Sequence, residues 1–270
     1  MSFEIRKALI PAAGASKRMM PLSSIIPKPF LPLGLCPLIE YSIKEAKISG
    51  IKNIGIIVSP SMVQVAENYS RIKKNSGINI SIFIQDVPKG LVHALLMAKD
   101  WVKGEYVAVL NPDSLFVSVD PPLKILLNSI AGNDIQDKVI VPIIRMKDEW
   151  AERFAASGMV EVEGDKKIKR IKMVLPKERG KTFKQAGGVW KLCGRYVFSP
   201  KAFKELEKPF QEKGEHDDTP YLMNWAMEGR LLGIDIDAEP LDCGIPWGYM
   251  HGLNILVSGK GPDWWPKEIV

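Results

Sequence analysis

A short apolar segment opens into small residues and then into two bases, and the chain is organised around this stretch: Leu9-Ile10-Pro11-Ala12-Ala13-Gly14-Ala15-Ser16-Lys17-Arg18-Met19. Small side chains after a strand let a phosphate-bearing ligand approach backbone N–H groups closely. Arg18 adds a forked donor suited to phosphate oxygens, and Lys28 adds a charge from a loop stiffened by Pro27 and Pro29. An ordinary strand-to-helix turn with solvated bases is the alternative for the first half, because small-residue loops are weak motifs. The two halves together favour a phosphate-binding loop.

Strands and helices alternate through the first half of the chain. Short, apolar, β-branched runs predict strands at 8–11, 54–58, 80–85 and 106–110, and helical spacing predicts helices at 37–49, 62–73 and 91–102. This alternation indicates an α/β fold with a mostly parallel sheet and helices on both faces. Ligands in such sheets bind beyond the carboxyl ends of the strands, where the opening loop and the loop after Leu110 would both lie.

The second half has the pattern of an antiparallel sub-layer. We expect strands at 138–144, 189–198 and 231–236, a hairpin over 159–174 that turns at Gly164-Asp165, and helices at 199–206, 220–227 and 249–257. No internal repeat, low-complexity tract or long linker interrupts the chain. Residues 1–270 are therefore interpreted as a single domain.

Composition limits the class of protein. The 270 residues are 46% hydrophobic and 25% charged, which is typical of a soluble globular protein, and no apolar run is long enough to predict a membrane span. The net charge of +6 is spread along the chain, and the basic run 166–172 alternates with apolar residues as a half-exposed strand does. We therefore expect no nucleic-acid polymer as a partner. Three separated cysteines without metal-ligand spacing indicate reduced thiols and a cytoplasmic location: Cys36, Cys193 and Cys243.

Two carboxylates follow apolar segments at places where a ligand could bind. Asp113 stands in Asn111-Pro112-Asp113, directly after the run 107–110, and Asp242 ends a late apolar segment just before Gly244. Carboxylates at this edge of an α/β sheet are well placed to hold Mg²⁺. A turn for Asp113 and a helix N-cap for Asp242 are the alternative interpretations.

Short motifs then follow one another over roughly residues 7 to 257: Pro11-Ala12-Ala13-Gly14, Arg18-Met19-Met20-Pro21, Ile26-Pro27-Lys28, Leu31-Pro32-Leu33, Pro37-Leu38-Ile39, Gly90-Leu91-Val92-His93-Ala94, Leu110-Asn111-Pro112-Asp113, Gly194-Arg195-Tyr196-Val197-Phe198, Asp242-Cys243-Gly244 and Gly248-Tyr249. Their order resembles that of bacterial and archaeal sugar-1-phosphate nucleotidylyltransferases, and most of all the UTP–glucose-1-phosphate uridylyltransferase branch. The combined order is far more specific than any one motif.

The resemblance implies a Rossmann-like nucleotidyltransferase fold and a two-substrate reaction. An oxygen of a sugar 1-phosphate, glucose 1-phosphate in this branch, would attack the α-phosphorus of a nucleoside triphosphate such as UTP and release pyrophosphate. Arg18 and Lys28 would be the catalytic cations, and Asp113 and Asp242 would hold Mg²⁺. The nucleotide side would comprise Ala12, Ala13, Gly14, Ser16, Lys17, Gln85 and Gly90. Phosphoryl-type transfer depends on positioning and charge neutralisation more than on covalent chemistry, so His93 is expected to pack or to hydrogen-bond.

The sequence departs from the family pattern in two places. The usual glycine and threonine before Arg18 are replaced by Ser16 and Lys17. The family's Glu-Lys-Pro is replaced by Val174-Leu175-Pro176, so a side chain that reads sugar hydroxyls and one that contacts the sugar phosphate are both missing.

Three residues are candidates for the sugar-phosphate side: Leu175, Lys177 and Trp190. Lys172 or Lys177 would replace the missing lysine only if the strand register or the loop path differs from the family's. Trp190 either stacks on the sugar or packs in the core.

Three functions remain open at this level. The first is Mg²⁺-dependent synthesis of a nucleotide sugar from UTP and glucose 1-phosphate. The second keeps the chemistry with another base or sugar 1-phosphate, and the third is a non-catalytic homologue that binds a nucleotide and regulates a partner. Adjacent Trp264 and Trp265 either cap the core or anchor a subunit contact, and family members are often dimers or tetramers, so we expect a homo-oligomer.

Overall fold

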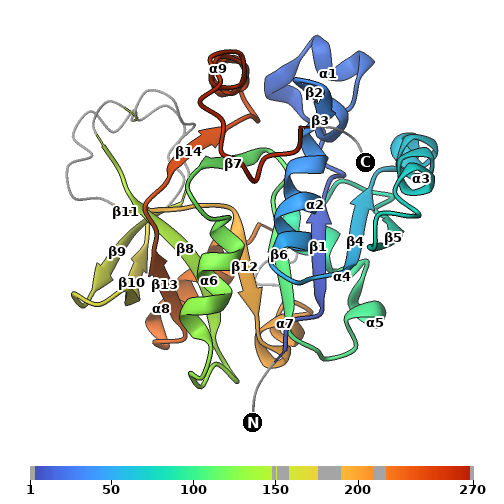
Figure 1. The fold of residues 1–270 in the computed structure, drawn as a ribbon. Helices are drawn as coiled ribbons and strands as arrows, with labels where there is room; N and C mark the ends of the chain where they lie inside the picture. Colours follow the sequence, from blue (N-terminus) through green and yellow to red (C-terminus); the bar gives the residue numbers. More distant parts are fainter. Residues whose placement is uncertain (1–3, 148–149, 151–157, 176–189, 209–216, 268–270) are drawn as a thin grey trace.

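The computed structural model describes residues 4–147, 150, 158–175, 190–208 and 217–267, and its centre is a twisted sheet (Figure 1). Ten strands of these ranges pair in the order β11-β9-β10-β13-β8-β12-β6-β1-β4-β5. Their bounds are β1 Lys7–Pro11, β4 Asn53–Val58, β5 Asn79–Ile84, β6 Val107–Leu110, β8 Val139–Arg145, β9 Met159–Glu163, β10 Ile168–Val174, β11 Trp190–Leu192, β12 Arg195–Phe198 and β13 Leu231–Asp235.

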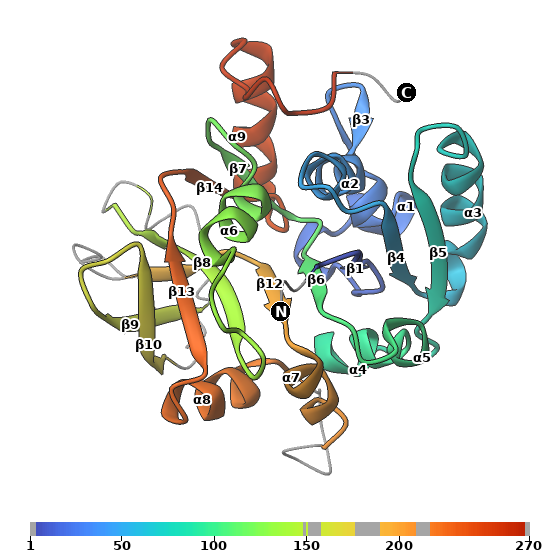
Figure 2. The ribbon, with the colours of Figure 1, turned by 60° about the horizontal axis from the view of Figure 1, so that its bottom comes forward.

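The first half of the sheet is parallel. Strand β1 pairs with β4 on one side and with β6 on the other, and β4 pairs in turn with β5. The chain therefore leaves β1 in one direction and returns to its other side at β6, as the neighbouring strands of Figure 2 show. In open α/β sheets this reversal of strand order places the ligand crevice beyond the carboxyl ends of the strands.

The second half is largely antiparallel, as the sequence predicts. Strand β12 runs antiparallel to β6 and β8, and β9 and β10 form the predicted hairpin. Strand β13 is the exception, because it pairs parallel with β8 and antiparallel with β10. The expected α/β fold with an antiparallel sub-layer is confirmed.

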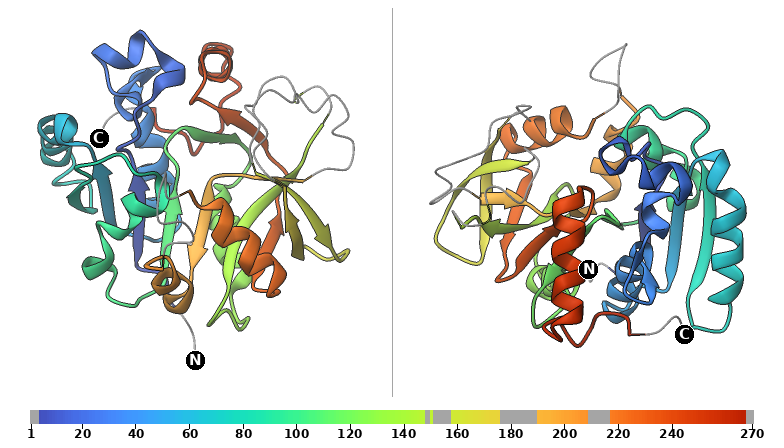
Figure 3. Two further views of the ribbon diagram at one scale, coloured as in Figure 1. Left: turned by 180° about the vertical axis from the view of Figure 1, so that it is seen from behind. Right: turned by 90° about the horizontal axis from the view of Figure 1, so that it is seen from above.

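Helices cover both faces of the sheet. Their bounds are α1 Leu22–Ile25, α2 Leu38–Ile48, α3 Val63–Ile72, α4 Leu91–Leu96, α5 Lys99–Val102, α6 Pro122–Ile130, α7 Pro200–Glu205, α8 Thr219–Met227 and α9 Pro246–Val257. The views from behind and above show α7 and α8 on the face opposite α2 and α6 (Figure 3). Alternate β1 residues enter separate cores: Ala8 and Ile10 pack on the α2 side, and Leu9 packs on the α4 side.

Several predicted elements differ from the observed ones. The single helix expected over 91–102 is two short helices, α4 and α5. The strand expected over 189–198 is divided into β11 and β12 at Gly194, whose φ of +61° interrupts the extended backbone. Helix α6 and the small pair of strands β7 (Ser114–Val117) and β14 (Glu239–Asp242) were not predicted. A second small pair joins β2 (Pro32–Leu33) to β3 (Cys36–Pro37).

The two adjacent tryptophans near the end of the chain pack inside it. Trp264 and Trp265 are 7% and 2% exposed, and their indole N–H groups donate to the carbonyls of Ser118 (2.9 Å) and Phe116 (3.0 Å). The ring of Trp265 also packs edge-on against Tyr41. They cap the core, so the alternative of a subunit anchor is not supported. Over the described ranges, no helix has the length and apolar character needed to cross a membrane.

Candidate active site

A cavity of about 400 Å³ opens at the carboxyl ends of the parallel strands. Its walls come from the loops after β1, β5 and β6, which open at the same edge because these strands run parallel in the order β6-β1-β4-β5. Six of the seven residues predicted for the nucleotide side line it: Ala12, Ala13, Gly14, Lys17, Gln85 and Gly90. Lys28 and Asp113 line it as well.

The small-residue loop keeps a glycine-like shape despite its departure from the family pattern. Ser16, which replaces the usual glycine, has φ 52° and ψ 30°, a left-handed conformation that costs a non-glycine residue about 1 kcal/mol or more. Its hydroxyl donates to the carbonyl of Gly14 at 3.1 Å, and the side chain faces a neighbouring depression rather than the cavity. Ser16 thus adopts a backbone conformation that glycine adopts more easily.

Gln85 closes one end of the cavity. Its backbone N–H donates to Val58, and its side-chain amide donates to the carbonyl of Gly90 at 3.1 Å and contacts His93 Nδ1 at 2.9 Å. Gly90 has φ 95°, a left-handed value that suits glycine, and it begins α4. His93 therefore has the hydrogen-bonding position that the sequence predicts.

Asp113 and Asp242 converge from distant parts of the chain. Strand β14 pairs with β7 so that Asp242 lies opposite Ser114, directly after Asp113, and Cys243 N–H donates to the carbonyl of Asp113 at 2.8 Å. Asp113 Oδ2 forms an ion pair with Lys28 Nζ at 2.6 Å, and Asp242 Oδ2 lies 3.9 Å from Arg18 Nη1. The turn predicted at Asn111-Pro112-Asp113 is also present, since Ser114 N–H donates to the carbonyl of Asn111.

The absence of a side chain at Gly244 leaves room between these two carboxylates. A Cβ there would lie 2.6 Å from Asp113 Oδ2, 2.9 Å from Asp242 Oδ1 and 3.4 Å from Arg18 Nη2. Gly244 N–H also donates to Asp242 Oδ1 at 3.0 Å. Two carboxylates and a guanidinium thus point into one small space above a glycine.

Their surroundings shift the pKa values of the two carboxyl groups in opposite directions. Burial acts to raise the pKa of Asp113, but the charges of Lys28 and Arg18 outweigh it, and the pKa is lowered. Burial raises the pKa of Asp242, the Asp113 carboxylate raises it further, and Arg18 and Lys191 only partly compensate. The pKa values of the two carboxyl groups are thus shifted in opposite directions, although the two groups lie in the same small space.

A divalent cation fits this donor set. Within the described residues no group of three or more His, Cys, Asp or Glu side chains could hold a metal, so the protein offers two carboxylates and no closed cage. Mg²⁺ is commonly held by one or two carboxylates, with substrate phosphates and water completing its coordination. The space above Gly244, which both carboxylates face, suits such an open site.

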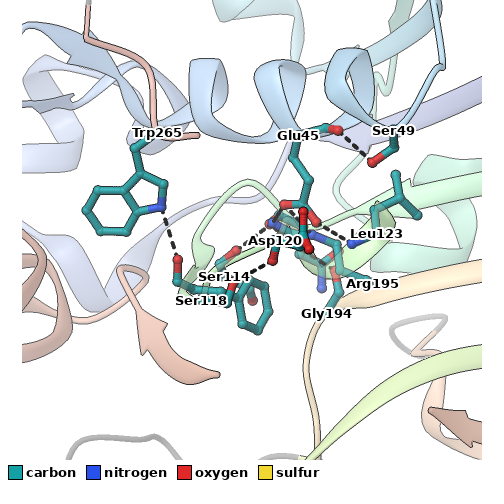
Figure 4. Close-up of polar contacts among 11 residues, drawn as sticks. Glu45, Ser49, Ser114, Ser118, Asp120, Leu123, Gly194, Arg195 and Trp265 are labelled. Carbon is teal, nitrogen blue, oxygen red and sulfur yellow. Dashed lines mark hydrogen bonds and ion pairs between the residues drawn. The ribbon is translucent and has the colours of Figure 1, made fainter. Parts of the chain in front are cut away.

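A buried ion pair supports the strand end that carries Asp113 (Figure 4). Glu45 of α2 and Arg195 of β12 are both fully buried, and two guanidinium nitrogens donate to Glu45 Oε2 at 2.8 and 3.1 Å. Arg195 also donates to the carbonyls of Asn111 (2.9 Å) and Ser114 (2.8 Å), which flank Asp113. The guanidinium therefore fixes the turn on both sides of the carboxylate.

Asp242 is fixed by the start of α9. A Cβ on Gly248 would lie 2.0 Å from the Asp242 carbonyl oxygen, so only glycine lets the helix approach this closely. Asp242 does not cap the helix, because the N-cap position is Ile245 and the Asp242 side chain accepts from Gly244 instead. The N-cap alternative for Asp242 was therefore wrong.

A second cavity of about 240 Å³ lies on the other side of the carboxylates, and we call it the acceptor cavity. It shares Leu91, Asn111 and Asp113 with the first cavity, and it includes Arg18 and Asp242. Its remaining lining comes mainly from the antiparallel half: Ser114, Leu115, Phe116, Gly158, Val174, Leu175, Lys191, Leu192, Cys193, Gly194, Tyr196, Asp217, Asp218, Thr219, Leu222, Pro240 and Leu241. Two cavities thus meet at Asp113.

The candidates for the sugar-phosphate side are separated by the structure. Leu175 lines the acceptor cavity, whereas Trp190 does not: its half-buried ring packs against the second core, with Lys169 Nζ 5.3 Å from the ring centroid. Lys177 lies outside the described residues.

Sequence reasoning missed Lys191, Asp217 and Asp218, which line this cavity. No short sequence pattern distinguishes these three residues from other polar residues of the second half.

The two adjoining cavities and the paired carboxylates at a crest of parallel strands define a nucleotide-handling α/β protein. Residues 7–228 match the model of the nucleotidyl transferase family, and the chain belongs to that family. It is 31% identical to UTP–glucose-1-phosphate uridylyltransferase of Mycoplasma genitalium, over 100% of this chain and 97% of that protein.

One further relative supports the membership, and one solved structure supports the fold. The enzyme of the same name from Pseudomonas aeruginosa is 28% identical, over 94% of this chain and 96% of that protein. The crystal structure of a UDP-glucose pyrophosphorylase complexed with UDP-glucose superposes with a TM-score of 0.79 at 24% identity, covering 95% of this chain and 100% of that one. The predicted Rossmann-like nucleotidyltransferase fold is thereby confirmed.

Proposed function

We propose that this protein transfers a uridylyl group from UTP to glucose 1-phosphate, giving UDP-glucose and pyrophosphate, with Mg²⁺ as cofactor. The observation that carries the proposal is the junction of two cavities at Asp113, with Arg18, Lys28 and Asp242 around it. Curated relatives over nearly the whole chain that are named UTP–glucose-1-phosphate uridylyltransferase support the same substrates.

The cavity beyond β1 suits the nucleotide. Its floor is backbone and small side chains, which permit close approach of a ribose and phosphates, and Gln85 and Gly90 line its far side. The acceptor cavity suits a sugar, because Asp217, Thr219 and Tyr196 give it polar walls beside apolar Leu175 and Leu222. In this arrangement the acceptor phosphate meets the α-phosphate at the shared wall.

The reaction forms one P–O bond and breaks another. An oxygen of the acceptor phosphate attacks the α-phosphorus, and the bond to the β-phosphate breaks so that pyrophosphate leaves with its electron pair. Lys28, which lines the nucleotide cavity, neutralises charge that builds on the α-phosphate. Arg18, half exposed at the mouth of the junction, binds the leaving phosphates.

Asp113 and Asp242 would hold Mg²⁺, which supplies charge neutralisation and orientation for the triphosphate. Until substrate binds, Lys28 balances the charge of Asp113 at 2.6 Å. The shell around these groups keeps them in place, since Arg195 holds the turn of Asp113 and Gly248 seats the strand of Asp242. Positioning of this kind accounts for much of the acceleration in phosphoryl-type transfer.

The test is release of pyrophosphate from each of the common nucleoside triphosphates with a panel of sugar 1-phosphates and Mg²⁺. We expect the highest kcat/KM with UTP and glucose 1-phosphate. Asp113→Asn should lose activity while its melting curve remains cooperative. Binding of a nucleotide without pyrophosphate release from any pair would contradict an enzymatic function.

One observation favours a second candidate sugar. The acceptor cavity has Val174 and Leu175 where the family pattern has a hydroxyl-reading Glu and a Lys, and it has Asp217 and Asp218 on another wall. A site whose polar groups are rearranged selects for a different pattern of hydroxyls. Release of pyrophosphate with UTP and another hexose 1-phosphate, but not with glucose 1-phosphate, would assign that sugar instead.

A further inference from the structure

The acceptor cavity lacks the expected cation at the end of β10. Val174 and Leu175 both line it there, and Leu175 is a neutral, apolar side chain. A sugar 1-phosphate carries up to two negative charges, and binding it in a partly enclosed cavity is unfavourable unless a cation faces the phosphate. Some other side chain must therefore face the phosphate.

Lys191 of β11 faces the same cavity from two strands away. It pairs with Met159 of β9, and the carbonyl of Met159 accepts from the Leu175 N–H at 2.8 Å, so Lys191 and Leu175 lie on either side of one residue. Trp190, the preceding residue of β11, does not line this cavity.

The burial of Lys191 is unusual for a lysine. The residue is 7% exposed, and lysines are almost never buried unless a negative charge accompanies them. Negative groups line the same cavity: Asp217, Asp218, Asp113 and Asp242.

Few of the described basic side chains line the acceptor cavity. Among the described residues that line the acceptor cavity, the cations are Arg18 and Lys191. Lys28 lines the nucleotide cavity and pairs with Asp113. Lys172, an alternative from the sequence, is exposed on β10 and is not part of the cavity wall.

We propose that Lys191 binds the phosphate of the acceptor and replaces the lysine missing after β10, an inference that rests on the proposed function. Its ammonium donates to phosphate oxygens that do not attack, and it holds the attacking oxygen on the side of the shared wall at Asp113. The lysine forms no covalent bond and transfers no proton. It determines where the acceptor lies and that the acceptor must carry a phosphate.

The experiment compares wild type with Lys191→Met, Lys191→Gln and Lys191→Arg, and it uses Lys172→Met as a matched control on the exposed side. Loss of a charge-assisted hydrogen bond to phosphate raises the KM for glucose 1-phosphate roughly 10- to 100-fold. The KM for UTP should change by about twofold or less, because the nucleotide cavity is untouched. Lys191→Arg should recover part of the loss, and Lys172→Met should match wild type.

A second readout does not depend on turnover. Inorganic phosphate should compete with glucose 1-phosphate in wild type, and its inhibition constant should rise in Lys191→Gln by the same factor as the KM. Calorimetric binding of glucose 1-phosphate to the protein with Mg²⁺ and a non-hydrolysable UTP analogue should weaken in parallel. Lys191→Gln and Lys191→Arg retain a polar side chain, so the test stands even if Lys191→Met unfolds at the assay temperature.

The outcomes separate this inference from the proposed function. Wild-type turnover with unchanged acceptor KM in the Lys191 variants would overturn the inference and leave the function in place. An equal rise in both KM values would assign a merely structural role to Lys191. Lys191-dependent binding of glucose 1-phosphate without turnover would support the inference and contradict the function, and absence of both binding and turnover would overturn both.

Discussion

Replacement of Gly244 by alanine would test how closely the two carboxylates must approach. The new Cβ would lie 2.6 Å from Asp113 Oδ2 and 2.9 Å from Asp242 Oδ1, so the Asp113 carboxylate must move by about 0.8 Å to reach an ordinary contact of 3.4 Å. A displacement near 1 Å in a catalytic group can cost about 100-fold in rate, or about 2.7 kcal/mol of transition-state stabilisation. We therefore expect kcat/KM to fall about 100-fold.

The folded state should tolerate this change. Gly244 does not have a left-handed φ, so alanine adopts its backbone conformation without strain. Loss of chain freedom in the unfolded state offsets part of the local crowding, and the free energy of unfolding should change by about 1 kcal/mol or less. Activity and stability are thus expected to separate.

The assay measures pyrophosphate release at several Mg²⁺ concentrations, with chemical denaturation in parallel. Gly252→Ala is the matched control, because its Cβ would meet the side chains of Leu33 at 3.3 Å and Cys243 at 3.5 Å and neither carboxylate. We expect Gly244→Ala to need more Mg²⁺ for half-maximal rate and Gly252→Ala to resemble wild type. Wild-type activity in Gly244→Ala would refute the convergence of Asp113 and Asp242 on one cation.

Three further predictions concern stability. In the absence of metal, Asp113→Asn should destabilise the protein and Asp242→Asn should stabilise it, as thermal unfolding across pH would show. Because the pKa of Asp113 is lowered by folding, its carboxylate stabilises the folded state fully above the pKa of the unfolded chain, and this stabilisation is lost as the pH falls through the folded-state pKa. Because the pKa of Asp242 is raised by folding, its carboxylate destabilises the folded state fully above the folded-state pKa and not at all below the pKa of the unfolded chain. Neither substitution should therefore change stability in strong acid. Gly248→Ala places a Cβ 2.0 Å from the Asp242 carbonyl and should cost about 1–3 kcal/mol in urea unfolding; an unchanged midpoint would contradict the close seating of α9. Arg195→Met leaves buried Glu45 without its cation and should cost about 3–5 kcal/mol by the same measurement, whereas a loss below 1 kcal/mol would show that the pair is dispensable.

Local sequence patterns were sufficient to predict the strands of the parallel half of the fold. Runs such as 54–58 are apolar and bounded by polar segments, and they occur in the structure within a residue or two as strands. Local patterns did not predict elements that form only by pairing with a strand far away in the sequence. Strands β7 and β14 have four residues each and, among the strands of the described ranges, pair only with each other, so no short window of sequence identifies them.

The candidate site likewise has parts that the sequence predicts and parts that it does not. The loop after β1 and the turn before Ser114 could be predicted, because each lies at the end of a recognisable strand. The convergence of Asp242 on Asp113 depends on the register of β14 against β7, and the space between them depends on Gly244. The position of Lys191 depends on which face of β11 meets the acceptor cavity, which alternation alone does not determine.

The central claim is that one chain joins a nucleotide cavity to an acceptor cavity across Asp113 and transfers the α-phosphate between them. The most direct test incubates the protein with glucose 1-phosphate, Mg²⁺ and UTP labelled at the α-phosphorus, and then separates the products. We predict that the label appears in UDP-glucose, that unlabelled pyrophosphate is released in equal amount, and that Asp113→Asn abolishes both. Label that remains in UTP, or that appears in free UMP or inorganic phosphate, would contradict the account.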